Sequence, residues 1–302
     1  MDVVRTDLAM ENLDQGSSLP GTEVHQWESD GIQVTEVIIA TEEAAGQLKK
    51  PVGSYLTLEC PPLSEHDPDA RMAMENLLGE ELARMLQSDE NAPVLVVGLG
   101  NRDVTPDALG PKAVDRTLVT RHMLGSAYAS PQLRSVCAIA PGVLGVTGVE
   151  TAEMVESLAH RLKPAAILCI DSLAARDSGR IGCTIQLSNT GIQPGSGVGN
   201  HRRALTRENL GAEVIAVGVP TVVYAATLAR DAFSLLTGDD ENTADGLHAM
   251  EHALLDTQLG NMIVTPRDID RIITDCAGLI AGGINRALQP HLSSAEIAQM
   301  MG

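Results

Sequence analysis

The sequence predicts an α/β protein with three layers and a mostly parallel central sheet, phosphorylase/hydrolase-like in general form. From residue 93 onward, short apolar runs alternate with amphipathic helical patterns. The apolar runs PVLVVGLG and AAILCID are continuous, which is typical of strands buried on both faces of a parallel sheet. Hydrophobic residues make up 44% of the 302 residues, which is enough for a sizeable core.

The elements follow from the pattern in chain order. Two strands are expected at 31–39 and 54–60, and a helix then begins with Asp67 as N-cap and Pro68 in the first helical position. The alternating part predicts a strand at 93–100, a helix at 111–124, a strand at 133–140, a helix at 150–163, a strand at 165–171, a strand nearer the edge at 181–188, a strand at 213–220, a helix at 221–237 and a final helix at 268–288.

The chain divides into an arm and one domain. Residues 1–30 are polar and contain Gly-Ser-Ser and Pro-Gly, so we expect an N-terminal arm rather than a packed element. Residues 31–302 form a single α/β domain, with a polar excursion from the sheet near 238–262.

Charge and cysteine content exclude several classes of partner. The net charge is −19 and aromatic residues are only 2%, which argues against direct binding to nucleic acid. The five cysteines are scattered without a CxxC pair, as in a reduced, cytoplasmic protein. We find no signal peptide and no apolar run long enough to cross a membrane, so no membrane partner is expected.

Two aspartates lie at the ends of predicted strands. Asp107 follows the strand at 93–100, and Asp171 ends the strand at 165–171. Ligands of open α/β sheets bind beyond the carboxyl ends of the strands, so neighbouring strands would place both carboxylates in one crevice. Either aspartate alone could instead cap a turn or a helix.

Several chemistries were compared for this pair. Two close carboxylates share a proton, so one can activate water while the other polarises a carbonyl. A divalent metal held with His201 is an alternative, as is a binding module without catalysis. A dinucleotide site is rejected, because Asp103 occupies the third glycine position of GxGxxG. We favour the water-activating pair, for which we expect no metal and no cofactor.

Six motifs carry a resemblance to a known family. They are VVGLGNRDVTPDALGPKAVD, PGVLGVTGVET, IDSLAARD, IQLSNTGIQPGSGVGNHR, VGVPTVV and MIVTPRDID. Together they resemble the spore germination proteases from about residue 3 to about residue 288, and that family is similar in fold to the hydrogenase maturation endopeptidases.

The resemblance implies an atypical aspartic endopeptidase of the spore core. Its substrates would be small acid-soluble spore proteins, and it would be made as a zymogen and assemble as a homotetramer. The catalytic pair of the family falls on Asp107 and Asp171. A nickel-dependent, hydrogenase-maturation-type endopeptidase is the alternative activity.

The N-terminal arm contains a candidate processing site. Residues 6–11 read Thr, acid, bulky apolar, Ala, any residue, Glu. The substrates of the resembled family are cut after the acid in Thr-Glu-Phe-Ala-Ser-Glu. We therefore predict self-cleavage between Asp7 and Leu8, which removes a short propeptide of residues 1–7.

Recognition of the acid before the scissile bond requires a local base in so acidic a chain. The candidates are Arg202 and Arg203, which follow the glycine-rich stretch, and Arg176, which lies shortly after Asp171. All three could equally be solvated surface charges.

Overall fold

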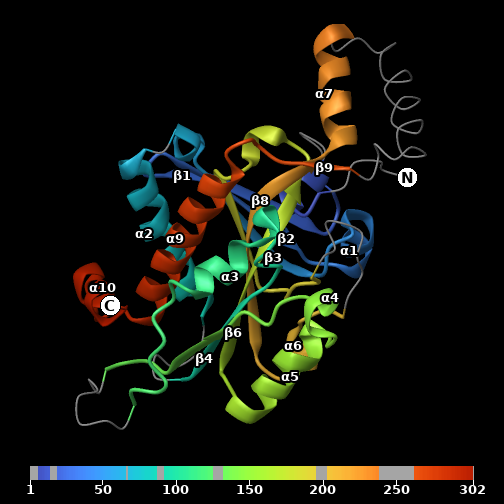
Figure 1. Ribbon diagram of the computed structural model, residues 1–302. Helices are drawn as coiled ribbons and strands as arrows, with labels where there is room; N and C mark the ends of the chain where they lie inside the picture. Colours follow the sequence, from blue (N-terminus) through green and yellow to red (C-terminus); the bar gives the residue numbers. More distant parts are fainter. Residues whose placement is uncertain are drawn as a thin grey trace.

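The computed structural model describes residues 6–13, 19–65, 67–86, 92–124, 132–194, 203–237 and 262–301. Within these residues the core is one mixed sheet of nine strands with helices on both faces, as Figure 1 shows. The expected α/β class is confirmed. The polar excursion near 238–262 lies outside the described residues apart from its last position.

The sheet has a parallel half and an antiparallel half. Its order is β1-β2-β3-β7-β8-β6-β4-β5, with β9 paired to β8. Strands β8, β6, β4 and β5 run parallel, whereas β1, β2, β3 and β7 are joined by antiparallel pairing. The strands are β1 (Thr22–Ser29), β2 (Ile32–Ile39), β3 (Gly53–Glu59), β4 (Val94–Gly98), β5 (Val136–Ile139), β6 (Ala166–Ala175), β7 (Thr184–Ser188), β8 (Glu213–Tyr224) and β9 (Ile263–Val264).

Helices cover both faces of the sheet, because successive side chains of each strand point to opposite faces and both faces are apolar. In β4, Val94 and Val96 face the layer of α2, α3 and α9, whereas Leu95 and Val97 face α5. The helices are η1 (Ala9–Asn12), α1 (Glu42–Leu48), η2 (Pro61–Glu65), α2 (Pro68–Met85), η3 (Thr105–Asp107), α3 (Leu109–Val114), α4 (Leu144–Thr147), α5 (Thr151–Leu162), η4 (Ser178–Arg180), α6 (Arg207–Leu210), α7 (Ala225–Thr237), α9 (Ile269–Leu288) and α10 (Ser294–Met301).

Several expected elements differ in extent. The helix expected to reach residue 124 ends at Val114, because the Leu118 N–H instead donates to the buried Asn285 side chain of α9 at 2.8 Å. Strand β8 continues to Tyr224, so the helix after it begins only at Ala225. The strand at 181–188, expected near an edge, is β7 in the sheet interior, because its carboxyl half pairs with β8 and its full length with β3.

The described parts of the expected N-terminal arm, residues 6–13 and 19–30, are packed elements. Strand β1 pairs along its whole length with β2, and η1 is partly buried against the body. The low hydrophobicity of this stretch reflects a strand at the sheet edge, most of whose side chains are exposed. Among the described residues, no helix combines the length and the apolar character that crossing a bilayer requires.

Helix α3 crosses the ends of β4 and β6 at backbone contact. A Cβ at Gly110 would lie 2.3 Å from the Leu99 carbonyl oxygen and 2.6 Å from that of Ile170. A Cβ at Gly98 would lie 2.2 Å from the Gly110 carbonyl oxygen. Only glycine therefore permits this approach.

We predict that Gly110→Ala lowers the free energy of unfolding by about 1–3 kcal/mol, because backbone rather than a flexible side chain must move. Gly46→Ala is the matched control. Gly46 lies in the exposed part of α1 with nothing within 4 Å of an added Cβ, so its replacement should be neutral or stabilising. Urea unfolding of both variants measures the effect, and equal stabilities would contradict the packing argument.

Candidate active site

The structure brings Asp107 and Asp171 to the same end of two adjacent parallel strands. Strands β4 and β6 pair up to Gly98 and Ile170, and the Leu99 N–H continues the ladder by donating to the Ile170 carbonyl at 2.8 Å. Asp171 is the residue after Ile170, and Asp107 ends η3 in the loop that follows β4. The expected proximity of the two strands is confirmed.

The Asp107 carboxylate is held by the loop that carries it. The Asn101 N–H donates to Asp107 Oδ2 at 2.8 Å. Gly100 has φ +107°, and a Cβ there would lie 2.0 Å from the Asp107 carbonyl oxygen. The Gly-Asn pair therefore lets the loop fold back on the aspartate, which is half-buried.

Asp171 lies inside β6 rather than at its end. The strand continues to Ala175 because residues beyond Asp171 keep pairing with β8, past a bulge at Leu173 and Ala174. The side chain is buried, and its Oδ1 accepts the Ser172 N–H at 2.9 Å. Sequence patterning missed this continuation because Asp and Ser interrupt the apolar run.

Burial is the main cause of the raised pKa of Asp171. The negative charge of Asp107 raises this pKa further, the Ser172 N–H opposes the shift, and Asp7 adds a smaller increase. The result lies well above the ordinary value for an aspartate. The pair therefore retains a proton where an isolated aspartate would be ionised.

Residues 6–13 lie against the same end of the sheet, and we call their surroundings the docking site. The Asp7 N–H donates to the Ala174 carbonyl at 2.8 Å, and the Ala174 N–H donates to Asp7 Oδ2 at 2.9 Å. Two side chains donate to the Asp7 carbonyl oxygen, Lys50 Nζ at 2.8 Å and Gln186 Nε2 at 3.0 Å. The peptide bond between Asp7 and Leu8 is thereby fixed near the strand that carries Asp171, whose pKa the Asp7 carboxylate raises.

The two residues after Asp7 are fully buried. Leu8 has 0% of its surface exposed and packs with Leu173, Ala175, Ile181 and Val223. Ala9, also 0% exposed, packs in a cluster formed by β2, β3 and α1. Its N–H donates to Gln186 Oε1 at 2.7 Å.

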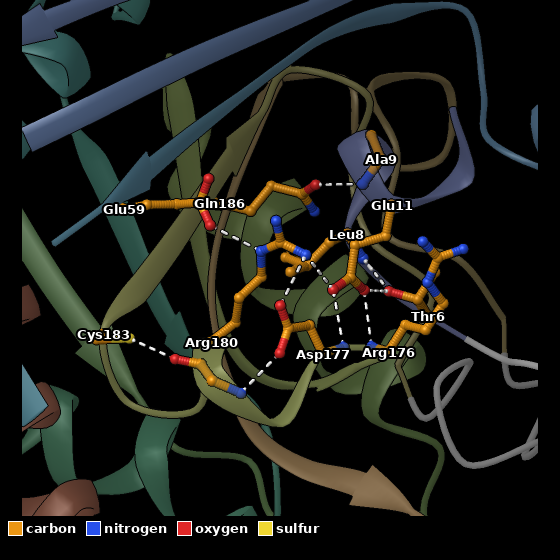
Figure 2. A network of polar contacts seen from close by, with 11 residues as sticks. Thr6, Leu8, Ala9, Glu11, Glu59, Arg176, Asp177, Arg180, Cys183 and Gln186 are labelled. Carbon is orange, nitrogen blue, oxygen red and sulfur yellow. Dashed lines mark hydrogen bonds and ion pairs between the residues drawn. The ribbon is translucent and has the colours of Figure 1, made fainter. Parts of the chain in front are cut away.

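The Glu11 carboxylate of the docked segment accepts hydrogen bonds from several donors, which Figure 2 shows. The N–H groups of Arg176 and Asp177 donate to it at 2.7 and 3.0 Å, and Arg180 Nη1 donates at 2.7 Å. The Thr6 hydroxyl also donates to it. Arg180 in turn is oriented by Glu59, at 2.7 Å from its Nε.

Of the three arginines expected to meet the acid before the scissile bond, the two that the structure describes lie in different contacts. Arg176 contributes its backbone N–H to Glu11, and Arg203 forms an exposed ion pair with Glu156 at 3.0 Å. Arg202 lies outside the described residues. Among the described residues, the basic side chain that the structure places against Asp7 is Lys50, whose pKa is lowered by burial and partly restored by Asp7.

Sequence reasoning missed Lys50, Gln186 and Arg180. Gln186 left a usable signal, because it is a long polar residue inside the otherwise small and apolar strand TIQLS. Lys50 and Arg180 left none, since each sits in an ordinary polar turn and reaches the site only through folding. Among the described residues, no group of three or more His, Cys, Asp or Glu side chains could hold a metal ion. His201 lies outside these residues.

Comparison with known proteins decides the family. The family described as "Germination protease" matches residues 2–245. This chain belongs to the germination protease family. It is therefore a protease, a hydrolase, that acts in germination.

Relatives named germination protease match nearly the whole chain. The protein from Clostridium perfringens is 41% identical, with 99% of each chain covered. That from Caldanaerobacter subterraneus subsp. tengcongensis is 42% identical, covering 99% of this chain and 98% of the relative. That from Priestia megaterium is 37% identical, covering 94% and 93%.

Among solved structures, a [NiFe] hydrogenase maturation protease, HycI from Thermococcus kodakarensis, is similar at 18% identity. The match covers 47% of this chain and 80% of that chain, with a TM-score of 0.31. A likeness this distant carries no conclusion about mechanism.

The raised pKa of Asp171 predicts how the stability of the fold depends on pH. Because the folded state holds this proton more tightly than the unfolded state, the contribution of Asp171 to stability falls as pH rises through and above about 4. Asp171→Asn should therefore raise the melting temperature at pH 7, and the gain over the unmodified chain should grow between pH 4 and pH 8.

The measurement is calorimetry of the intact 302-residue chain, with its mass verified, across this pH range. Asp103→Asn is the control, because Asp103 is exposed in the loop that carries Asp107. A difference between Asp171→Asn and the unmodified chain that stays constant with pH would contradict the assignment.

Proposed function

We propose that this chain is an atypical aspartic endopeptidase that begins the degradation of small acid-soluble spore proteins during germination, and that it is made as a zymogen that cleaves itself between Asp7 and Leu8. One observation carries the proposal. Residues 6–11, which read Thr-Asp-Leu-Ala-Met-Glu, are docked with the Asp7 main chain bonded to Ala174, three positions after Asp171 in β6, and to Lys50 and Gln186.

The contacts of the docked segment support this proposal. The Asp7 N–H donates to the Ala174 carbonyl and the Asp7 carboxylate accepts the Ala174 N–H. Leu8 has an extended backbone with φ −82° and ψ 123°, and the side chains on both sides of the bond are buried. The buried N–H of Asp7 and the carboxylates of Asp7 and Glu11 all have hydrogen-bond partners. Such pairing is typical of a peptide bound in a defined register.

The proposed chemistry uses one proton shared by the pair. Ionised Asp107 takes a proton from water, whose oxygen forms a bond to the Asp7 carbonyl carbon. Asp171, which holds its proton through burial, gives that proton to the Leu8 nitrogen as the carbon–nitrogen bond breaks. The products are a new carboxyl group on Asp7 and a free amine on Leu8, and the pair again holds one proton.

The wider proposal follows the family resemblance. Substrates carry the pattern Thr-Glu-Phe-Ala-Ser-Glu and are cut after the first acid. The enzyme works in the spore core as a homotetramer, without a cofactor and without direct contact with nucleic acid or membrane. An arginine at 176, 202 or 203 as partner of the acid before the scissile bond stays a prediction.

We predict that Asp107→Asn and Asp171→Asn each slow removal of residues 1–7 by at least about 100-fold, because each removes one half of the proton transfer. Asp103→Asn should process at the rate of the unmodified chain. Mass spectrometry of protein sampled over time measures the rate and identifies the new N-terminus, expected at Leu8.

Two further outcomes bear on this test. A chelator should leave processing unchanged, whereas strong inhibition would favour the nickel-dependent alternative. Normal processing in either aspartate variant, or a mature chain that begins elsewhere than Leu8, would overturn the proposal. Melting temperatures of the variants show whether each is folded.

A further inference from the structure

The Asp7 carbonyl oxygen accepts hydrogen bonds from two side chains that lie far apart in the sequence. Lys50 follows α1, and Gln186 belongs to β7. Their nitrogens lie 2.8 and 3.0 Å from this oxygen. Two donors at these distances from one carbonyl oxygen are the arrangement that stabilises the negative charge that develops there during attack by water.

We propose that Lys50 and Gln186 are catalytic residues that polarise the scissile carbonyl, both in self-cleavage and in substrates. This inference rests on the proposed cleavage between Asp7 and Leu8. In this scheme, Lys50 and Gln186 stabilise charge on the carbonyl oxygen. Asp171 then needs to protonate only the leaving nitrogen of Leu8.

Gln186 also fixes the register of the bond. Its Nε2 donates to the Asp7 carbonyl, and its Oε1 accepts the Ala9 N–H at 2.7 Å. One buried amide therefore spans the scissile bond, and both of these hydrogen bonds are to main-chain atoms. Because these two hydrogen bonds do not depend on the side chains of the bound peptide, Gln186 can form them with any peptide in the docking site.

Lys50 places a cation where the chain is otherwise acidic. Asp7 and Asp107 contribute negative charge around the bond, whereas Asp171 holds its proton. Charge-assisted donors are about twice as strong as neutral ones, so Lys50 should matter more than Gln186 as the oxyanion forms. The neighbouring Lys49 is exposed and provides a matched control.

The test measures self-cleavage and docking in the same protein. We expect Lys50→Met to slow removal of residues 1–7 by about 100-fold or more, and Gln186→Glu, which keeps the acceptor for Ala9 but loses the donor, to slow it by at least about tenfold. Lys50→Arg should recover part of the rate, and Lys49→Met should behave as the unmodified chain. Hydrogen exchange should show residues 7–11 equally protected in all unprocessed variants.

The outcomes separate this inference from the proposed function. Normal rates in Lys50→Met and Gln186→Glu, with Asp171→Asn blocked, would overturn only the carbonyl assignment. Loss of protection in parallel with the rate would also overturn it, because both residues would then merely hold the segment. Normal processing in the aspartate variants would instead overturn the proposed function.

A second observation, independent of the first, concerns Glu11. Its side chain is 0% exposed, yet it receives donors from two backbone N–H groups, Arg180 and Thr6. We propose that this set of donors is a subsite for an acidic residue four positions after the scissile bond, with Arg180 as its specificity-determining side chain.

The construction of this subsite favours a carboxylate over an amide. The backbone N–H groups of Arg176 and Asp177 come from consecutive residues and cannot turn away, so an amide would face one of these donors with its own NH₂ group (Figure 2). Glu59 holds Arg180 in place before any ligand arrives. Since Glu11 remains on the enzyme after cleavage, a substrate enters only once residues 8–13 have left the docking site.

Two peptides test the subsite on self-processed enzyme. One has the sequence of residues 3–13, and the other replaces Glu11 by Gln. We expect kcat/KM to fall by about tenfold for the Gln peptide, the effect of a lost charged hydrogen bond. Arg180→Met should lower cleavage of the Glu peptide and reduce this discrimination, whereas Arg207→Met, at an exposed ion pair with Glu213, should preserve it.

Equal kcat/KM for the two peptides, or full discrimination in Arg180→Met, would overturn the subsite. Failure to cut either peptide would count against the proposed function instead. Glu11→Gln in the intact chain gives a second measurement that does not depend on folding of the arginine variant, and its self-cleavage should be slower.

Discussion

The contact between backbone at Gly110 and backbone at Leu99 and Ile170 is the constraint on which the site depends. Parallel pairing of β4 and β6 aligns the strand ends, but alignment alone leaves the loop after β4 free to carry Asp107 elsewhere. Helix α3 begins two residues after Asp107, so fixing α3 across both strands fixes the aspartate. A side chain at Gly110 would lift the helix and separate the two carboxylates.

The chemistry of the docking site explains how a chain of net charge −19 holds an acidic peptide. Long-range attraction is unavailable, so binding relies on donors in contact with each acid. The Ala174 N–H donates to the Asp7 carboxylate, and the N–H groups of Arg176 and Asp177 donate to the Glu11 carboxylate. Backbone donors add no net charge and are fixed by β6 and the turn after it, so they compensate buried carboxylates without side-chain ordering. Lys50 and Arg180 add one cation at each end.

Sequence reasoning could propose the aspartate pair because ligands of parallel sheets bind at the carboxyl ends of the strands. The end of β4 can be read from its apolar run, and the Gly-Asn loop marks the turn that returns to Asp107, whereas β6 continues past Asp171. The antiparallel half and the pairing of β7 were not legible, because strand order is set by contacts far apart in sequence. The cation near Asp7 was sought among arginines close to the motifs. The residue that the structure places there is Lys50, which lies 57 positions before Asp107 and reaches the site through the packing of α1 against β2 and β3.

Tethering changes what the docking site must achieve. A segment on the same chain is present at high effective concentration, so even modest contacts keep it bound. Under the proposed function, the contacts that present the Asp7–Leu8 bond for cleavage also exclude other substrates until it is cut. Binding therefore cannot decide when the zymogen matures, since the segment is docked before the event. The step that remains is the proton transfer, and the proton on Asp171 depends on burial and on its acidic neighbours. Under the proposed function, control of maturation would therefore lie in the protonation and hydration of the aspartate pair rather than in arrival of the segment.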